Sequence, residues 1–332
     1  MRADRPLPGP GEVLVRIHAS GVNPSDVKKR AGWGNTAPPV HPVVPHADGA
    51  GIVEALGPDV DPNWLGQRVW IFNAQGSAGY GLKDGPEVGT AADWAALPTG
   101  CIAALPETAS FETGACLGVP AITAHYAVFS DGPVEGMTLL VQGGAGAVGE
   151  LAIQFAAAAG ARVLSTVSSP GKAAIAQRAG AERSFDRHDG ELAAAIRAAA
   201  PDGIDRIVEV DFGANAALDA KVPNVGGRIA AYSSPSNRHP EMPYYELQMR
   251  AAQIRLISNV LIPRSAIDSA IGGINDALVH NRLRPTISMS YALEQIASAH
   301  ESVERGTSLG KTILAMDVEK VGPSDKPPLG FA

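Results

Sequence analysis

Three glycines at a fixed spacing carry the clearest chemical meaning in this sequence. Gly144, Gly146 and Gly149 stand between an apolar run and an alanine-rich amphipathic segment, and a second apolar run follows. Glycine permits a tight turn and a close backbone approach, while the helix N-terminus offers free N–H groups and a positive dipole to an anion. A purely structural turn would not need the flanking strand, helix and strand, so we predict a Rossmann-type site for a dinucleotide pyrophosphate. The predicted contacts are Gly144, Ala145, Gly146, Ala147, Val148 and Gly149.

The end of the second apolar run indicates which dinucleotide binds. Sites specific for NAD place Asp or Glu there, where it binds the ribose 2′-OH. This chain has Ser168 and Ser169 instead, with Lys172 one helical turn later. Hydroxyls and an ammonium suit a 2′-phosphate, and a charge-assisted hydrogen bond contributes about 1.5–3 kcal/mol. We therefore predict NADPH as the cofactor. In the alternative, Ser169 only caps its helix and Lys172 is solvated.

The bulk composition excludes several classes of function. The 332 residues have a formal net charge of −7 without a basic stripe, which argues against a nucleic-acid partner. No stretch approaches the roughly 20 apolar residues of a membrane span, so we expect no membrane partner. The two cysteines provide neither a disulfide framework nor a structural zinc site. These features favour a cytoplasmic enzyme with about two domains.

Two hydrophobic patterns divide the chain. Up to about residue 110, short alternating runs bounded by glycine and proline predict strands, among them 12–18, 51–57 and 67–72. From about residue 111, apolar runs alternate with helical segments, which predicts right-handed crossovers and a parallel sheet. The fold class is therefore α/β, with a doubly wound parallel sheet and a β-rich substrate domain.

Several segments, in order, resemble one protein family. They are Pro8–Val15, Gly21–Asp26, Asp48–Val53, Gly143–Gly149 and Leu309–Lys311. With them the chain is similar to the zinc-free quinone oxidoreductase (zeta-crystallin-like) branch of the medium-chain dehydrogenase/reductase superfamily.

The resemblance implies a particular organisation of the chain. A GroES-like substrate domain would comprise 1–115 and 263–332, and a Rossmann domain 116–262, with a cleft between them. Family members begin with a further β-hairpin, which we expect this substrate domain to lack, since Met1–Ala3 joins the first strand almost directly. The resemblance also implies a homodimer formed through the edge strand at 255–260.

Zinc ligands are missing where the superfamily's alcohol dehydrogenases carry them. Those enzymes hold Zn²⁺ with Cys, His and Cys and leave one open position. The resemblance places Asn23, Ala47 and Val119 at these positions. His41 and His46 are an alternative pair of ligands, but histidines in proline-rich loops are more often surface or hydrogen-bonded groups. On an extended segment, moreover, the side chain of His46 would turn to the face opposite the ligand position. We therefore predict no metal.

Hydride transfer without a metal requires an acceptor that stabilises its own developing charge. A quinone or an α,β-unsaturated carbonyl delocalises that charge, so hydrogen-bond donors suffice. By resemblance, Asn23 and Asp26 lie on the cleft floor and Thr123 lies near the nicotinamide. Asn23 is the preferred donor unless it forms an Asx-type turn, and Asp26 more readily caps the helix that begins there. Asp48 would orient Asn23 or a water, or only fix the following turn.

The nicotinamide side departs from the family pattern. Tyr232 and Ser233 replace a glycine loop, and Lys28 replaces a tyrosine that often follows Asp26 by two positions. Asn259 is placed to reach the carboxamide, unless it only lies at the dimer edge. The departures keep open a second hypothesis, a catalytically idle NADPH-binding regulatory or structural protein. A zinc-dependent alcohol dehydrogenase is the third.

Overall fold

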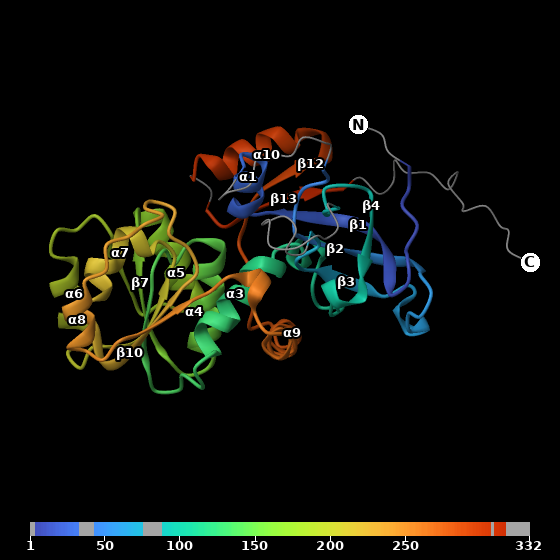
Figure 1. Ribbon diagram of the computed structural model, residues 1–332. Helices are drawn as coiled ribbons and strands as arrows, with labels where there is room; N and C mark the ends of the chain where they lie inside the picture. Colours follow the sequence, from blue (N-terminus) through green and yellow to red (C-terminus); the bar gives the residue numbers. More distant parts are fainter. Residues whose placement is uncertain (1–3, 33–42, 76–87, 307–308, 317–332) are drawn as a thin grey trace, which may run out of the picture.

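The computed structural model describes residues 4–32, 43–75, 88–306 and 309–316. Two sheets organise the chain and lie on opposite sides of the molecule, with helices α3 (Gly118–Phe129) and α9 (Arg264–Val279) between them (Figure 1). One sheet has seven strands and is mostly antiparallel, and the other has six strands that are all parallel. The predicted α/β class, with a β-rich second part, is confirmed.

The seven-stranded sheet joins both ends of the chain. Its order is β12-β13-β1-β2-β3-β5, and β4 pairs with β1. The strands are β1 (Glu12–Val22), β2 (Asp48–Leu56), β3 (Arg68–Ile71), β4 (Trp94–Pro98), β5 (Ile102–Ala104), β12 (Ile287–Ala292) and β13 (Lys311–Ala315). Gly21 of β1 pairs with Asp48 on one side and with Ile313 on the other. The register therefore brings the end of β1 and the beginnings of β2 and β13 to one edge.

Strand β1 continues four residues beyond the predicted 12–18. The small residues at 19–21 are buried between β2 and β13. Their backbone groups hydrogen-bond to a strand on each side, which keeps this segment in the sheet although it lacks large apolar side chains. A Cβ atom on Gly21 would lie 2.0 Å from the carbonyl oxygen of Ala115. Glycine is therefore required where the chain ahead of α3 crosses this strand.

The six-stranded sheet has the order β11-β10-β9-β6-β7-β8. Its strands are β6 (Thr138–Val141), β7 (Arg162–Val167), β8 (Arg183–Asp186), β9 (Ile204–Glu209), β10 (Pro223–Ala231) and β11 (Gln253–Leu256). The crossovers contain α4 (Ala147–Ala158), α5 (Pro170–Ala179), α6 (Leu192–Ala199), α7 (Phe212–Asp219) and α8 (Tyr244–Gln248). The prediction of a strand at 255–260 is wrong for its second half, because β11 ends at Leu256. The chain leaves the sheet after Leu256, and Asn259–Leu261 form a 3₁₀ turn closed by the bond from Leu261 N–H to the Ser258 carbonyl.

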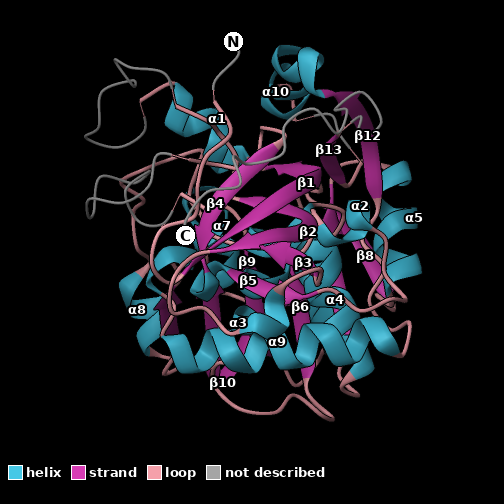
Figure 2. Ribbon diagram, turned by 90° about the vertical axis from the view of Figure 1, so that its right-hand side faces the viewer, coloured by secondary structure: helices cyan, strands magenta, loops and turns pink. Residues whose placement is uncertain are grey.

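The remaining helices are α1 (Pro24–Arg30), α2 (Phe111–Gly114), α3 (Gly118–Phe129), α9 (Arg264–Val279) and α10 (Ile296–Glu304). Of these, α2, α3 and α9 lie between strands of different sheets, whereas α1 and α10 each join two strands of the seven-stranded sheet. Helices α3 and α9 pack side by side (Figures 1 and 2). One buried apolar cluster includes Trp70 of β3, Ile122 of α3, Leu139 of β6 and Ile274 of α9, so the two sheets share a core. The domain boundaries at 115/116 and 262/263 stay a prediction. Within the described ranges, no helix is both long and apolar enough to cross a membrane.

Candidate cofactor and active site

The glycine turn between β6 and α4 has the close contacts that the sequence predicted. A Cβ atom on Gly144 would lie 2.0 Å from Ser165 Oγ of β7, and one on Gly149 would lie 2.4 Å from the Gly143 carbonyl oxygen. Gly143 itself has φ of 67°, in the left-handed region. Gly146 is the N-cap of α4, so the first-turn N–H groups at 147–149 have no partner within the helix. This turn can hold a pyrophosphate.

The predicted 2′-phosphate residues converge at the end of β7. The Lys172 ammonium donates to Ser168 Oγ over 3.1 Å, so it lies over the strand end. Ser169 Oγ accepts from the Lys172 backbone N–H over 3.4 Å and caps α5. Ser169 is therefore a helix cap, as the alternative held, and the Lys172 ammonium is held at the strand end by Ser168. Binding of a 2′-phosphate by these residues stays a prediction.

Asn23, Asp48 and Lys311 form a buried cluster at the meeting point of β1, β2 and β13. The Asn23 amide Nδ2 donates to Asp48 Oδ2 over 2.7 Å, and the Lys311 ammonium donates to the same oxygen over 3.1 Å. Lys311 also donates to Asn23 Oδ1. All three are at most 3% exposed. Burial raises the pKa of Asp48, and the Lys311 ammonium opposes that rise.

Two of the alternatives for this cluster are distinguished by its contacts. The Asn23 side chain bonds to Asp48 and Lys311 and makes no cap hydrogen bond to α1, which favours the donor interpretation over the Asx-type turn. Asp48 orients Asn23, and its other oxygen accepts from the Val119 backbone N–H over 2.8 Å. The sequence analysis quoted Lys311 as part of a motif but did not predict it as a site residue. A lysine at the head of an otherwise apolar strand was the available signal.

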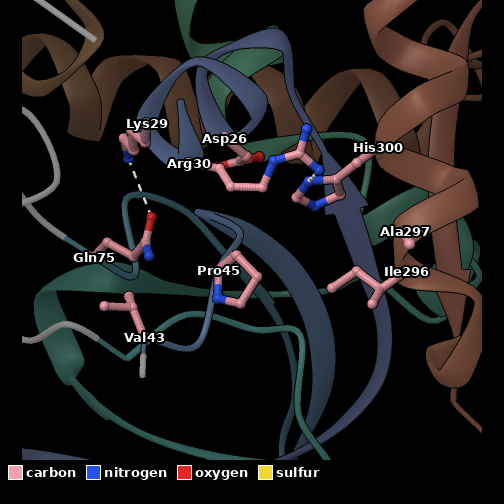
Figure 3. Close-up of a pocket in the computed structure, with 9 residues that line it drawn as sticks. All are labelled: Asp26, Lys29, Arg30, Val43, Pro45, Gln75, Ile296, Ala297 and His300. Atoms are coloured by element: carbon pink, nitrogen blue, oxygen red, sulfur yellow. Dashed lines mark hydrogen bonds between the residues drawn. The ribbon is translucent and has the colours of Figure 1, made fainter. Parts of the chain in front are cut away.

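Asp26 caps α1, as its preferred interpretation held. Its Oδ2 accepts from the Asn23 backbone N–H over 2.8 Å. Among the described residues no donor reaches its Oδ1, and burial raises the pKa of this carboxyl. Asp26 also lines a cavity of about 340 Å³ between α1 and α10, whose wall includes Pro45, Gln75 and His300 (Figure 3). The cap therefore faces α10, whereas the Asn23 amide faces β2 and β13.

Known proteins are similar to this chain in both sequence and fold. The alcohol dehydrogenase GroES-like domain matches residues 9–107, and the zinc-binding dehydrogenase family matches residues 147–263. Quinone oxidoreductase of Rattus norvegicus is 31% identical over 315 residues, covering 94% of this chain and 91% of the relative. The chain belongs to the quinone oxidoreductase branch of the medium-chain dehydrogenase/reductase superfamily.

Solved structures of this superfamily place the chain in its two-domain fold. Mycobacterial Rv1454c complexed with NADPH has a TM-score of 0.80 at 26% identity, over 95% of this chain and 94% of that one. An NAD-dependent alcohol dehydrogenase has a TM-score of 0.83 at 27% identity, over 97% and 95%. The family membership makes the chain an oxidoreductase with a site for a nucleotide of the NAD(P) type.

The three positions that hold catalytic zinc elsewhere in the superfamily do meet in space here. Asn23 and the backbone N–H of Val119 bind the two oxygens of Asp48, and Ala47 precedes Asp48 in the chain. None of these groups is a thiolate or an imidazole, so this donor set does not fit Zn²⁺. Over the described ranges, no group of three or more His, Cys, Asp or Glu side chains could hold a metal ion.

His46 is buried, and its backbone differs from the extended segment that the sequence predicted. Its φ is 77°, so the segment is not extended, and that part of the prediction is wrong. Its Nδ1 bonds to Ser20 Oγ and its Nε2 to His300 Nε2, each over 2.8 Å. The ring is thus a hydrogen-bonded group, as the preferred alternative held. His41 lies outside the described residues.

The residues expected near the nicotinamide occupy three separate elements. Thr123 lies on α3, and its buried Oγ1 has no hydrogen-bond partner in the part of the chain that the structure describes. The same holds for Ser25 Oγ, which the sequence analysis did not single out. Both hydroxyls are therefore buried polar groups without a protein partner among the described residues. Asn259 Nδ2 donates to Asn73 Oδ1 over 2.6 Å and so ties the end of the parallel sheet to the loop after β3.

Tyr232 and Ser233 follow β10 directly. The Tyr232 ring packs against the apolar core, and burial raises the pKa of its hydroxyl. The Ser233 carbonyl accepts from the Phe212 N–H over 3.1 Å, which joins this loop to the start of α7. The bulky replacement of the family's glycine loop is therefore anchored through its backbone and its ring.

Proposed function

We propose that this protein is an NADPH-dependent reductase of quinones or α,β-unsaturated carbonyls that works without zinc. The observation that carries the proposal is the buried Asn23 amide, held between a carboxylate and an ammonium at the position of a zinc ligand. NADPH, when bound, supplies the hydride.

The cluster fixes which way the Asn23 amide points. An ammonium can only donate and a carboxylate can only accept, so Oδ1 must face Lys311 and Nδ2 must face Asp48. Asp48 is the one acceptor of Nδ2 in the described part of the chain, which leaves the second Nδ2 hydrogen for an acceptor oxygen. The ammonium on Oδ1 polarises the amide and makes that hydrogen a stronger donor. A preorganised donor of this kind stabilises a developing oxyanion by about 2.7–4 kcal/mol.

The class of substrate follows from the strength of that donor. A neutral amide does not replace a Lewis acid for a simple carbonyl, whereas a conjugated acceptor spreads its negative charge over several atoms. Hydride adds to the conjugated carbon or to the quinone, the oxyanion accepts from Asn23, and one proton completes the product. The quinone oxidoreductase relatives support this class of acceptor.

The choice of NADPH is supported by Ser168, Ser169 and Lys172. The chain has Ser168 and Ser169, not Asp or Glu, directly after β7, and the Lys172 ammonium is held there. The NADPH complex of Rv1454c supports the same choice. Fold likeness does not separate the two cofactors, because an NAD-dependent alcohol dehydrogenase is equally similar.

We also propose a homodimer formed through β11, and a cytoplasmic location. Strand β11 is an edge of the parallel sheet, and Leu256 and Leu261 beside it are 78% and 64% exposed. Cys101 and Cys116 are free thiols, which suits a reducing compartment. The mass of the protein in solution tests the dimer.

A panel of acceptors tests the function. The protein is incubated with NADPH and a series of quinones and enals while the absorbance of NADPH is followed, and its zinc content is measured. We expect oxidation with at least one conjugated acceptor and no stoichiometric zinc. Tight NADPH binding with no turnover would instead favour an idle binding protein, and stoichiometric zinc would favour an alcohol dehydrogenase.

A further inference from the structure

Two carboxyl groups lie buried together behind the glycine turn. Glu209 is the last residue of β9 and Asp219 is the last residue of α7, and both are fully buried. Their side chains are hydrogen-bonded to each other. Neither residue belongs to the cluster of Asn23, Asp48 and Lys311.

Asp219 is connected to the glycine turn through two neutral side chains. Gln142 Nε2 donates to Asp219 Oδ1 over 3.0 Å, and Thr166 Oγ1 donates to Gln142 Oε1 over 2.6 Å. The Gly143 backbone N–H in turn donates to Thr166 Oγ1 over 3.3 Å. This chain of bonds runs from the end of α7 through Gln142, which follows β6, to Thr166 of β7, and it ends on the first residue of the turn.

Glu209 is connected to the start of α7 and to the loop after β10. Its carboxylate accepts from Asn215 Nδ2 over 3.0 Å and from the backbone N–H of Asp211. The Asp211 side chain accepts from Ser236 Oγ over 2.8 Å, and the Glu209 carbonyl accepts from the Tyr232 N–H over 3.0 Å. The pair therefore joins the glycine turn to the loop that follows β10.

The contact between the two carboxyls requires a proton. Asp219 Oδ2 has no donor in the described part of the chain, and two ionised carboxylates in contact without water would repel each other. Burial and the Glu209 charge raise the pKa of Asp219, and burial raises that of Glu209. The other titratable groups that face the pair are Asp211, whose negative charge also favours the proton, and the neutral Tyr232.

We propose that Glu209 and Asp219 share one proton and that this singly protonated pair positions the glycine turn and the loop after β10 for the dinucleotide. The proposal rests on the proposed function, in that the dinucleotide binds at this turn. Both residues are positioning residues, since each acts on the cofactor through other groups.

Loss of the shared proton should weaken cofactor binding. Deprotonation places a second negative charge in the buried pair, so Asp219 must move away from Glu209 or toward water, and the bonds through Gln142 to Gly143 break. If binding requires the proton, the dissociation constant for NADPH rises by up to about tenfold per pH unit above the pKa of the pair.

The test is a fluorescence titration of the protein with NADPH from mildly acidic to strongly alkaline pH, for the wild type and Asp219→Asn. The amide still donates to Glu209 but cannot ionise, so we expect the variant to lose the alkaline rise that the wild type shows. The comparison cancels the titrations of the 2′-phosphate and of Lys172, which both proteins share. Glu209→Gln serves as the second variant, with circular dichroism to confirm that each variant is folded.

Infrared difference spectra provide an independent readout. The wild-type spectrum should contain a protonated-carboxyl band that Asp219→Asn lacks and that disappears in parallel with NADPH affinity, which separates the pair from the other buried carboxyls. Identical pH profiles for the wild type and Asp219→Asn, or the absence of that band, would overturn this inference. Failure of the wild type to bind NADPH at any pH would instead overturn the proposed function.

Discussion

At the scale of single residues, the site depends on a neutral amide held by two charged side chains. Asn23 gains its orientation from Lys311 and Asp48, which come from strands near opposite ends of the chain. Lys311 is buried and balances the charge of Asp48. The same residue types in water would bind their solvent instead, so burial gives the amide a fixed direction.

Replacement of Asn23 by Ala removes the proposed oxyanion donor. We expect kcat with the best quinone to fall by about a hundredfold to a thousandfold, the effect of losing one preorganised donor. The dissociation constant for NADPH should stay unchanged, because Asn23 lies away from the glycine turn. Steady-state kinetics and a binding titration measure the two quantities. Asn63→Ala, an exposed asparagine in a turn, is the matched control, and an equal loss there would contradict the assignment.

Replacement of Lys172 by Ala tests the choice of cofactor. The variant loses the ammonium beside Ser168, so we expect the affinity for NADPH to drop about tenfold while the affinity for NADH stays the same. The control is Lys221→Ala, because Lys221 is exposed and, in the described part of the chain, hydrogen-bonded through its backbone only. Equal losses for both dinucleotides would show that Lys172 does not bind a 2′-phosphate.

At the scale of elements, the turn between β6 and α4 packs so closely against β7 and the start of α4 that no side chain fits at Gly144 or Gly149. The β6 turn touches β7 at Gly144 and the start of α4 at Gly149, so the backbone itself forms the surface offered to a ligand. The network from Glu209 to Gly143 then links three strand ends of the parallel sheet. Cofactor affinity is therefore a property of the packed sheet as well as of the turn.

A methyl group at Gly144 tests that packing. Gly144→Ala places its Cβ 2.0 Å from Ser165 Oγ, so we expect a loss of about 1–3 kcal/mol in the free energy of unfolding and loss of NADPH binding. Gly171→Ala is the control, since nothing lies within 4 Å of its Cβ position in the first turn of α5. Urea denaturation measures both variants. A Gly144→Ala protein as stable as the control would contradict the close contact.

At the scale of the whole molecule, a few polar bonds fix the two parts around their shared apolar core. Glu150 of α4 accepts from the Thr286 N–H over 3.0 Å and from Thr286 Oγ1 over 2.6 Å, just ahead of β12. Trp70 donates to Asn275 of α9 over 3.1 Å. These bonds connect the parallel sheet and its helices to the sheet that carries Asn23.

The buried Glu150 carboxyl makes stability depend on pH. Burial raises its pKa above the usual 4.5, and the bonds from Thr286 oppose that rise. The folded protein then holds the proton more tightly than the unfolded chain, so this contribution is full below pH 4.5 and is lost as pH rises through the raised pKa. We expect Glu150→Gln, which keeps the contacts without a charge, to be free of this loss. Urea denaturation at several pH values measures the free energy of unfolding of both proteins. The same pH dependence in the wild type and in Glu150→Gln would contradict this prediction.

The sequence by itself determined the glycine turn, the alternation of strands and helices, and the segment Ser168 to Lys172. Each depends on residues close together in the chain, whose spacing acts directly on local backbone geometry. By resemblance, the sequence also predicted that Asn23, Ala47 and Val119 take the positions of the superfamily's zinc ligands.

Only the tertiary structure decided what those positions do instead. Lys311 reaches Asn23 from 288 residues away, through a strand pairing that no local pattern encodes. Asp219 meets Glu209 because the helix after β9 returns to the end of its own strand, and His46 adopts a left-handed backbone that its neighbours in the sequence did not indicate. The reason is physical: desolvation and the contacts between buried groups arise only when distant segments pack together.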